Sequence, residues 1–240
     1  WSPFFHAWEM KGTYPKILKS PKYGIEAQKV FNDGKKILNE IIKDQSLTAK
    51  GIIGIFPAIA KNESVMTQNI QFDFSRQLMD KGKDSPQYSL ADFISPNEDH
   101  IGIFALTTGH GVKELVKEFE SKNDDYNAIM VKIIADRLAE AFAECMHKKI
   151  RTEIWGYAND ESLNIDELIK EKYQGIRPAP GYPACPNHDE KDKIWKILDV
   201  EKNIQISLTE NKAMYPEASI CGWYFSHPKS KYFSVGSTII

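Results

Sequence analysis

One stretch of the chain, residues 174–186, restricts the fold more than any other. It holds four prolines and two glycines in 13 residues. Proline lacks a backbone N–H and fixes its own φ angle, so this stretch is excluded from a helix interior and from a central strand. Each residue before a proline is also driven toward extended geometry. The sequence therefore predicts a stiff loop that can present its backbone groups to a ligand at little entropic cost.

Three residues of this loop are suited to ligand binding. Arg177 could hold a carboxylate through two parallel N–H groups. Tyr182 could stack on a ligand or donate a hydrogen bond, and Gly181 allows a close approach of the backbone. A purely structural loop that crosses the surface is the alternative interpretation, and the two carry about equal weight.

The rest of the chain predicts mixed secondary structure. Helical spacing of apolar residues predicts helices over residues 24–43 and 124–149. The aromatic segment 1–8 is predicted to be an edge segment rather than a helix. Strands are predicted at 51–56 (ended by Pro57), 69–77, 89–96, 99–107, 218–225 and 232–236. Because helices and strands do not alternate regularly, the α+β class is favoured over a doubly wound sheet.

Composition excludes several classes of protein. Lys and Arg total 31 and Asp and Glu total 33 in 240 residues, so the net charge of -2 lacks the basic footprint of a dedicated nucleic-acid binder. No apolar run approaches the roughly 20 residues of a membrane span. The three cysteines cannot all pair, which favours a reducing cytoplasm. We therefore expect no nucleic-acid partner, no membrane and a cytoplasmic location. Because the chain begins at Trp1, we also expect it to be a piece of a longer protein.

Familiar catalytic and metal-binding patterns do not occur in the sequence. Neither glycine-rich phosphate-binding pattern is present. Cys185 and His188 form half of a zinc pattern, but no second pair has comparable spacing, so we predict no metal ligand. Candidate nucleophiles and bases are scattered, so no catalytic residue is assigned.

Glu140 is a candidate for contact with a cationic ligand. It continues the line of Ile129 and Ile133 along one face of the predicted helix. A carboxylate on such a line can be partly shielded from water. The alternative is a solvated residue at the edge of the apolar face.

Several segments together resemble the activation domain of cobalamin-dependent methionine synthase, and the resemblance runs from Trp1 to about Gly236. The segments that carry it are 1–8 (WSPFFHAW), 90–93 (LADF), 124–127 (DDYN), 135–144 (ADRLAEAFAE), 155–157 (WGY), 177–188 (RPAPGYPACPNH), 222–228 (GWYFSHP) and 230–232 (SKY). The resemblance implies a single C-shaped α+β domain over residues 1–240, with a twisted antiparallel sheet and flanking helices. It also implies that the family's C-terminal helical end is missing here.

The resemblance further implies binding of S-adenosylmethionine and support for reductive remethylation of cob(II)alamin. The whole enzyme is a methyltransferase of methionine biosynthesis that acts on 5-methyltetrahydrofolate and homocysteine. The isolated chain is expected to bind the methyl donor without turnover. Cobalamin would be bound by another domain, and flavodoxin or an equivalent reductase would supply electrons. We expect the chain to be a monomer.

By motif match, the resemblance also assigns the residues of the donor site. Asp92 matches the acid that meets the α-amino group, and Arg177 matches the partner of the carboxylate. Glu140 matches a position lining the same site. The remaining matches are Ala179, Gly181 and Tyr182 in the loop and the aromatic pair Tyr232 and Phe233, where the family pattern has a second tyrosine.

Two other functions stay open. The chain could be an interaction module that docks a corrinoid protein or flavodoxin without useful donor binding. It could also be an adapted domain that reactivates a different corrinoid protein. The first alternative does not require Asp92 and Arg177 to converge.

Overall fold

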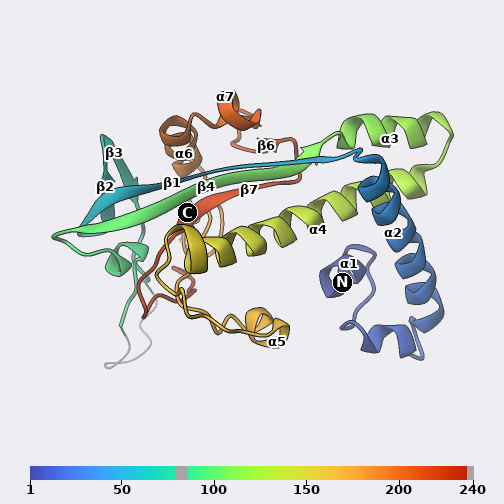
Figure 1. Cartoon of the computed structure of the whole chain (residues 1–240), viewed down its shortest axis with the longest axis horizontal. Coiled ribbons are helices and arrows are strands. Elements are labelled where there is room, and N and C mark those ends of the chain that lie inside the picture. The colour runs from blue at the N-terminus through green and yellow to red at the C-terminus, as the bar shows by residue number, and fades with distance from the viewer. Residues whose placement is uncertain (79–85, 237–240) are drawn as a thin grey trace. The chain divides into compact units, whose positions relative to one another are not determined.

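The computed structural model describes residues 1–78 and 86–236 (Figure 1). The α-helices are α1 (Ser2–Ala7), α2 (Gly24–Asp44), α3 (Val112–Ser121), α4 (Asp125–Lys149), α5 (Ile165–Ile169), α6 (Glu190–Leu198) and α7 (Val200–Ile204). Two 3₁₀ helices, η1 (Lys16–Lys19) and η2 (Leu90–Phe93), and a π-helical turn, η3 (Ile150–Ile154), complete the helical elements of this part of the chain.

The strands form a five-stranded sheet in the order β3-β2-β1-β4-β7 and a small sheet of β5 and β6. Their bounds are β1 (Thr48–Lys61), β2 (Ser64–Thr67), β3 (Ile70–Asp73), β4 (Asp99–His110), β5 (Ser207–Leu208), β6 (Met214–Tyr215) and β7 (Ser219–Tyr224). Antiparallel pairing aligns Ala58 of β1 with Thr67 of β2, and Val65 of β2 with Phe72 of β3. The predicted α+β class, with an antiparallel sheet and flanking helices, is confirmed.

The contacts divide the chain into two compact units. The first, here the helical unit, contains Trp1–Lys50, Thr107–Phe142 and Tyr215–Ser219. The second, the sheet unit, contains Gly51–Leu106, Ala143–Met214 and Ile220–Ile240. Each unit has a hydrophobic cluster of its own.

In the helical unit, α1 and α2 pack closely because α2 carries a glycine at the contact. A Cβ atom on Gly34 would lie 2.7 Å from the Phe4 ring. Phe4 and Phe5 are buried. The Phe4 ring packs edge to face on the rings of Trp1 and Phe5, with centroid distances of 5.0 and 5.5 Å. Glycine has a low helix propensity, but Gly34 allows the Phe4 ring to pack closely against α2.

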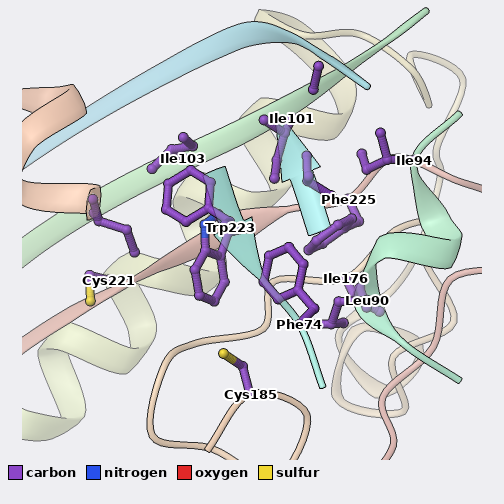
Figure 2. Packing of buried hydrophobic residues seen from close by; sticks show 14 of the residues in the cluster. Phe74, Leu90, Ile94, Ile101, Ile103, Ile176, Cys185, Cys221, Trp223 and Phe225 are labelled. Carbon is purple, nitrogen blue, oxygen red and sulfur yellow. The ribbon is translucent and has the colours of Figure 1, made fainter. Parts of the chain in front are cut away.

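In the sheet unit, β4 and β7 are buried on both faces. Ile101, Ile103 and Trp223 belong to the main cluster, together with residues of α6 and α7 (Figure 2). The alternate residues point to the opposite face, where Phe104 stacks on Tyr224 at 4.5 Å between ring centroids. This double burial explains why residues 101–106 of β4 form an uninterrupted apolar run.

Four predicted elements were wrong. Residues 1–8 contain helix α1, because Pro3 falls in the first helical turn, where no N–H is needed. The strand predicted over 89–96 is the 3₁₀ helix η2, and 232–236 is not a strand. Strand β1 continues past Pro57, whose missing N–H is tolerated because pairing with β2 begins at Ala58.

Replacing Gly222 of β7 by alanine should destabilise the protein. The added Cβ would lie 2.3 Å from the Pro178 carbonyl oxygen, a backbone atom that cannot move without breaking local hydrogen bonds. We expect a loss of about 1–3 kcal/mol in the free energy of unfolding, measured by urea denaturation. Ser226→Ala, which alters only a side chain near the same loop, serves as the control. An unfolding free energy of Gly222→Ala equal to that of the wild type would show that the loop is not held against β7.

Candidate functional site

The proline-rich loop lies along the outer edge of β7 as an additional short strand. Ile176 and Phe225 exchange two backbone hydrogen bonds, of 3.1 and 3.0 Å between N and O. The Trp223 N–H donates to the Pro178 carbonyl oxygen at 3.0 Å. At a sheet edge a proline's missing N–H can face away from the neighbouring strand, so the predicted exclusion from a central strand agrees with the structure.

This pairing sets the direction of each group in the loop. Successive side chains of a strand point to opposite faces, so Ile176 enters the core and Arg177 faces the other way. The backbone groups of residues 177 and 179 point away from β7 because those of Ile176 and Pro178 are used in pairing. The Arg177 N–H accordingly donates to the Tyr232 hydroxyl oxygen at 3.0 Å. Ala179 is thus placed to offer backbone atoms along the outer edge.

After this strand the loop turns sharply at Gly181. Its φ is +87°, and a Cβ atom there would overlap the His188 ring. The Gly181 N–H donates to Cys185 O at 2.8 Å, and the Cys185 N–H donates to Tyr182 O at 2.9 Å. Tyr182 is 59% exposed at the tip of this turn. The turn leaves the Tyr182 ring accessible to a ligand.

Asp92 lies in η2, where it already has three hydrogen-bond donors. Its Oδ2 accepts from the Ser89 N–H at 2.9 Å and completes a capping box with Ser89. The guanidinium of Arg76 reaches both carboxylate oxygens at 2.8 Å. Burial acts to raise the pKa of Asp92, but the hydrogen bonds from Arg76 and Ser89 outweigh it, so the pKa is lowered. Asp92 is therefore a fixed, ionised carboxylate.

Aromatic rings join the Asp92 segment to the C-terminal segment. The Phe93 ring lies 6.4 Å from that of Phe225 and 6.3 Å from that of Phe233, between centroids. Tyr88 stacks on Phe93 at 6.1 Å and lies 5.9 Å from Phe233. The half-buried Phe233 thus packs among rings, and Tyr232 beside it is 41% exposed.

The segments that carry Asp92 and Arg177 are anchored in the same core. Leu90, two residues before Asp92, and Ile176, one residue before Arg177, both belong to the main cluster. Phe225 contacts both segments, because it exchanges backbone hydrogen bonds with Ile176 and its ring lies 6.4 Å from that of Phe93 in η2. The sheet unit therefore brings together two neighbouring segments that carry opposite charges.

The Arg177 side chain is held from α4. Its Nη2 lies 3.3 Å from Oε2 of Glu144, and the two side chains are 19% and 34% exposed. Glu144, His147 and Arg151 follow one another at helical spacing on the same face. The fully buried His147 ring stacks on Tyr224 at 5.3 Å. Burial and the charges of Arg151 and Arg177 lower the pKa of His147 to about 2, so the ring is neutral.

Arg151, the last residue on this face, forms a buried ion pair with Glu161. Arg151 is fully buried and contacts both carboxylate oxygens of Glu161, with N–O distances of 2.7 and 2.9 Å. Its guanidinium also lies 4.0 Å from the centre of the Tyr173 ring. This bidentate pair fixes the chain that runs from η3 toward the loop.

Most of the residues assigned by resemblance lie in the sheet unit. These are Asp92, Arg177, Ala179, Gly181, Tyr182, Tyr232 and Phe233. Glu140 is half-buried on α4 within the helical unit, and its role toward the same ligand stays a prediction.

Two charged partners of these residues, Arg76 and Glu144, were not predicted from the sequence. Glu144 lies one helical turn after Glu140, so the helical spacing could have indicated it. Arg76 is 16 residues before Asp92, and nothing in the sequence pattern indicated that pair.

The part of the chain that the structure describes lacks both a cluster of metal-binding side chains and a helix suited to span a membrane. Residues 1–78 and 86–236 contain no group of three or more His, Cys, Asp or Glu side chains arranged to hold a metal ion. Burial raises the pKa of the Cys185 thiol to about 12, which disfavours the thiolate that binds metals. Within the same ranges, no helix has the length and apolar character to cross a membrane.

Comparison with known proteins assigns the family. The family model described as the activation domain of vitamin B12 dependent methionine synthase matches residues 1–239. A crystal structure of the MetH reactivation domain bound to AdoHcy is 46% identical and superposes with a TM-score of 0.94. That match covers 98% of this chain and 76% of the other. The chain therefore belongs to the family of vitamin B12 dependent methionine synthase activation domains.

Proposed function

We propose that this chain binds S-adenosylmethionine along the outer edge of the proline-rich loop and supports the remethylation of cobalamin held by another domain. The observation that carries the proposal is the anchoring of the Asp92 and Arg177 segments in one core. The amino-acid part of S-adenosylmethionine carries an ammonium and a carboxylate on the same carbon. Its binding therefore requires a negative and a positive side chain on neighbouring segments. The similar MetH domain was crystallised with AdoHcy, which has the same amino-acid and nucleoside parts.

Each residue has a distinct role in this proposal. Asp92 accepts hydrogen bonds from the α-ammonium, and Arg177 donates to the carboxylate. The outward backbone groups near Ala179 and Gly181 contact the rest of the ligand, with the Tyr182 ring against it. Tyr232 holds the Arg177 backbone, and Phe233 contributes an apolar surface. Glu140 favours the positive sulfonium.

The contribution of the chain to the reaction is orientation. The sulfonium already activates the methyl group, so no protein acid or base is needed at that carbon. When the cobalamin of the partner domain is present, its cobalt supplies the nucleophile. The residues of this chain would hold and orient the methyl donor, an effect that can contribute several kcal/mol. The whole reaction, from 5-methyltetrahydrofolate to homocysteine, requires other domains.

The wider assignments are part of the same proposal. They are a cobalamin-binding domain in the same or a partner protein, flavodoxin or an equivalent reductase, a cytoplasmic location and a monomeric state. The docking-module alternative is less favoured because it does not need Asp92 and Arg177 on neighbouring segments. An adapted domain that serves another corrinoid protein stays open.

Replacing Asp92 by asparagine should abolish most donor binding. The substitution keeps the shape but removes the charge that faces the ammonium. Isothermal titration with S-adenosylmethionine should give one-site binding for the wild type and a loss of about 1.5–3 kcal/mol for Asp92→Asn. Asp160→Asn, at an exposed turn, is the control. No binding by the folded wild-type chain would reject the proposed function and favour a docking module.

Replacing Arg177 by alanine should weaken the binding of S-adenosylmethionine by about 1.5–3 kcal/mol, because a charge-assisted hydrogen bond to the ligand carboxylate is lost. The same variant should bind decarboxylated S-adenosylmethionine about as well as the wild type does. Titration with both ligands checks this, with thermal unfolding to verify the fold. Equal weakening for both ligands would contradict the carboxylate role.

Replacing Cys185 by alanine should leave donor affinity and metal content unchanged. The thiol is buried in the core and remains protonated near neutral pH. Elemental analysis of the purified wild type and variant, with the same titration, measures both quantities. Loss of a bound metal in the variant would show that Cys185 and His188 form part of a metal site.

A further inference from the structure

The guanidinium of Arg76 makes hydrogen bonds to three residues, Asp92, Glu63 and Gln87. Its Nη1 and Nη2 each lie 2.8 Å from an oxygen of Asp92. Its Nε donates to Glu63 at 2.7 Å, and its Nη1 also donates to the Gln87 carbonyl oxygen at 2.8 Å. These bonds join the turn before β2, the segment after β3 and the approach to η2.

The backbone on both sides of Arg76 is also fixed. Phe74 is buried in the main cluster, and its carbonyl oxygen accepts from the Ser89 hydroxyl at 2.8 Å. The buried Gln77 side chain accepts from the Tyr88 N–H at 3.0 Å and donates to Ser234 O at 2.7 Å. Arg76 is therefore held between two anchors and does not depend on its own ion pairs for its place.

The hydrogen-bond count at Asp92 limits how a ligand can approach. A carboxylate offers about four lone-pair positions. Arg76 uses two and the Ser89 N–H uses a third. Among the contacts made by residues 1–78 and 86–236, these leave about one position, on a side chain that is 34% exposed. The carboxylate is thus prepared for a single further donor from solvent or from a ligand.

The charges of the group favour a cation in that position. Glu63, Arg76 and Asp92 carry two negative charges and one positive charge. The hydrogen bonds that Arg76 donates to Asp92 and Glu63 raise the pKa of Arg76, so the guanidinium stays charged. The group as a whole keeps an excess negative charge beside the remaining lone pair of Asp92.

We infer that Arg76 is a positioning residue that orients the Asp92 carboxylate so that its one remaining lone-pair position meets the ammonium of the ligand. This inference rests on the proposed function and adds a residue to its site. A salt bridge between partly exposed side chains contributes little stability by itself, so the main effect of this pair is on geometry. The effect should therefore be confined to ligands that have the ammonium.

The test compares two ligands in several variants. The ligands are S-adenosylmethionine and its 2-oxo analogue, in which a carbonyl replaces the ammonium and its carbon-bound hydrogen. The quantity measured by titration is the ratio of their dissociation constants. In Arg76→Gln we expect S-adenosylmethionine to bind roughly tenfold more weakly, the order of one charge-assisted hydrogen bond, with the analogue almost unchanged. Arg76→Lys keeps the positive charge but loses the paired N–H donors of the guanidinium. It should therefore restore the wild-type ratio of dissociation constants only in part.

Two controls keep the outcome interpretable. Lys122→Gln removes an exposed helical ion pair with Glu118 and should leave the ratio unchanged. Thermal unfolding of each variant verifies that it folds. Equal weakening of both ligands in Arg76→Gln, or an unchanged ratio, would overturn the positioning role.

The same data separate failure of this inference from failure of the proposed function. If the wild type does not distinguish the two ligands, or binds neither, the proposed role of Asp92 is wrong. If Asp92→Asn loses the distinction and Arg76→Gln keeps it, only the role of Arg76 is wrong.

Discussion

The pairing of residues 176–178 with β7 is the interaction on which the candidate site depends. Two hydrogen bonds to Phe225 and one to Trp223 fix the register of a segment that prolines make stiff. That register sends Ile176 into the core and turns Arg177 toward α4. It also directs the backbone of residues 177 and 179 outward. A shift of one residue would exchange these faces, so the register determines both the packing and the side on which the proposed ligand contacts lie.

Each charge of the proposed donor site, Asp92 and Arg177, has a partner of opposite sign that belongs to the fold. Arg76 holds Asp92, and Glu144 holds Arg177. The partners come from segments with their own anchors, Arg76 from the chain after β3 and Glu144 from α4. Charges that are already oriented require little rearrangement when a zwitterionic ligand arrives. The neutral His147 behind this face adds no competing charge.

The sequence supported some of these features better than others. Long helices such as α2 and α4 follow from apolar periodicity, and the exclusion of the loop from a central strand follows from proline chemistry. Residues 89–96 were predicted as a strand from their apolar pattern. Part of this segment forms the η2 helix because Ser89 and Asp92 make a capping box through their side chains, and this local signal outweighs the apolar pattern. Arg76 could not be found, since only tertiary folding brings β3 and η2 together. The polar face of Glu144, His147 and Arg151 has the pattern of a solvated surface, although His147 and Arg151 are fully buried.

Asp92 shows why binding and folding are linked at this site. The same carboxylate caps η2, receives the Arg76 fork and, in the proposed function, meets the ammonium. Its two structural roles keep it ionised, because donors that favour the charged form lower its pKa despite burial. Protonation would weaken the cap, the ion pair and the ligand contact together. The cap of η2 and the ion pair with Arg76 thus fix the orientation and the negative charge of the same carboxylate.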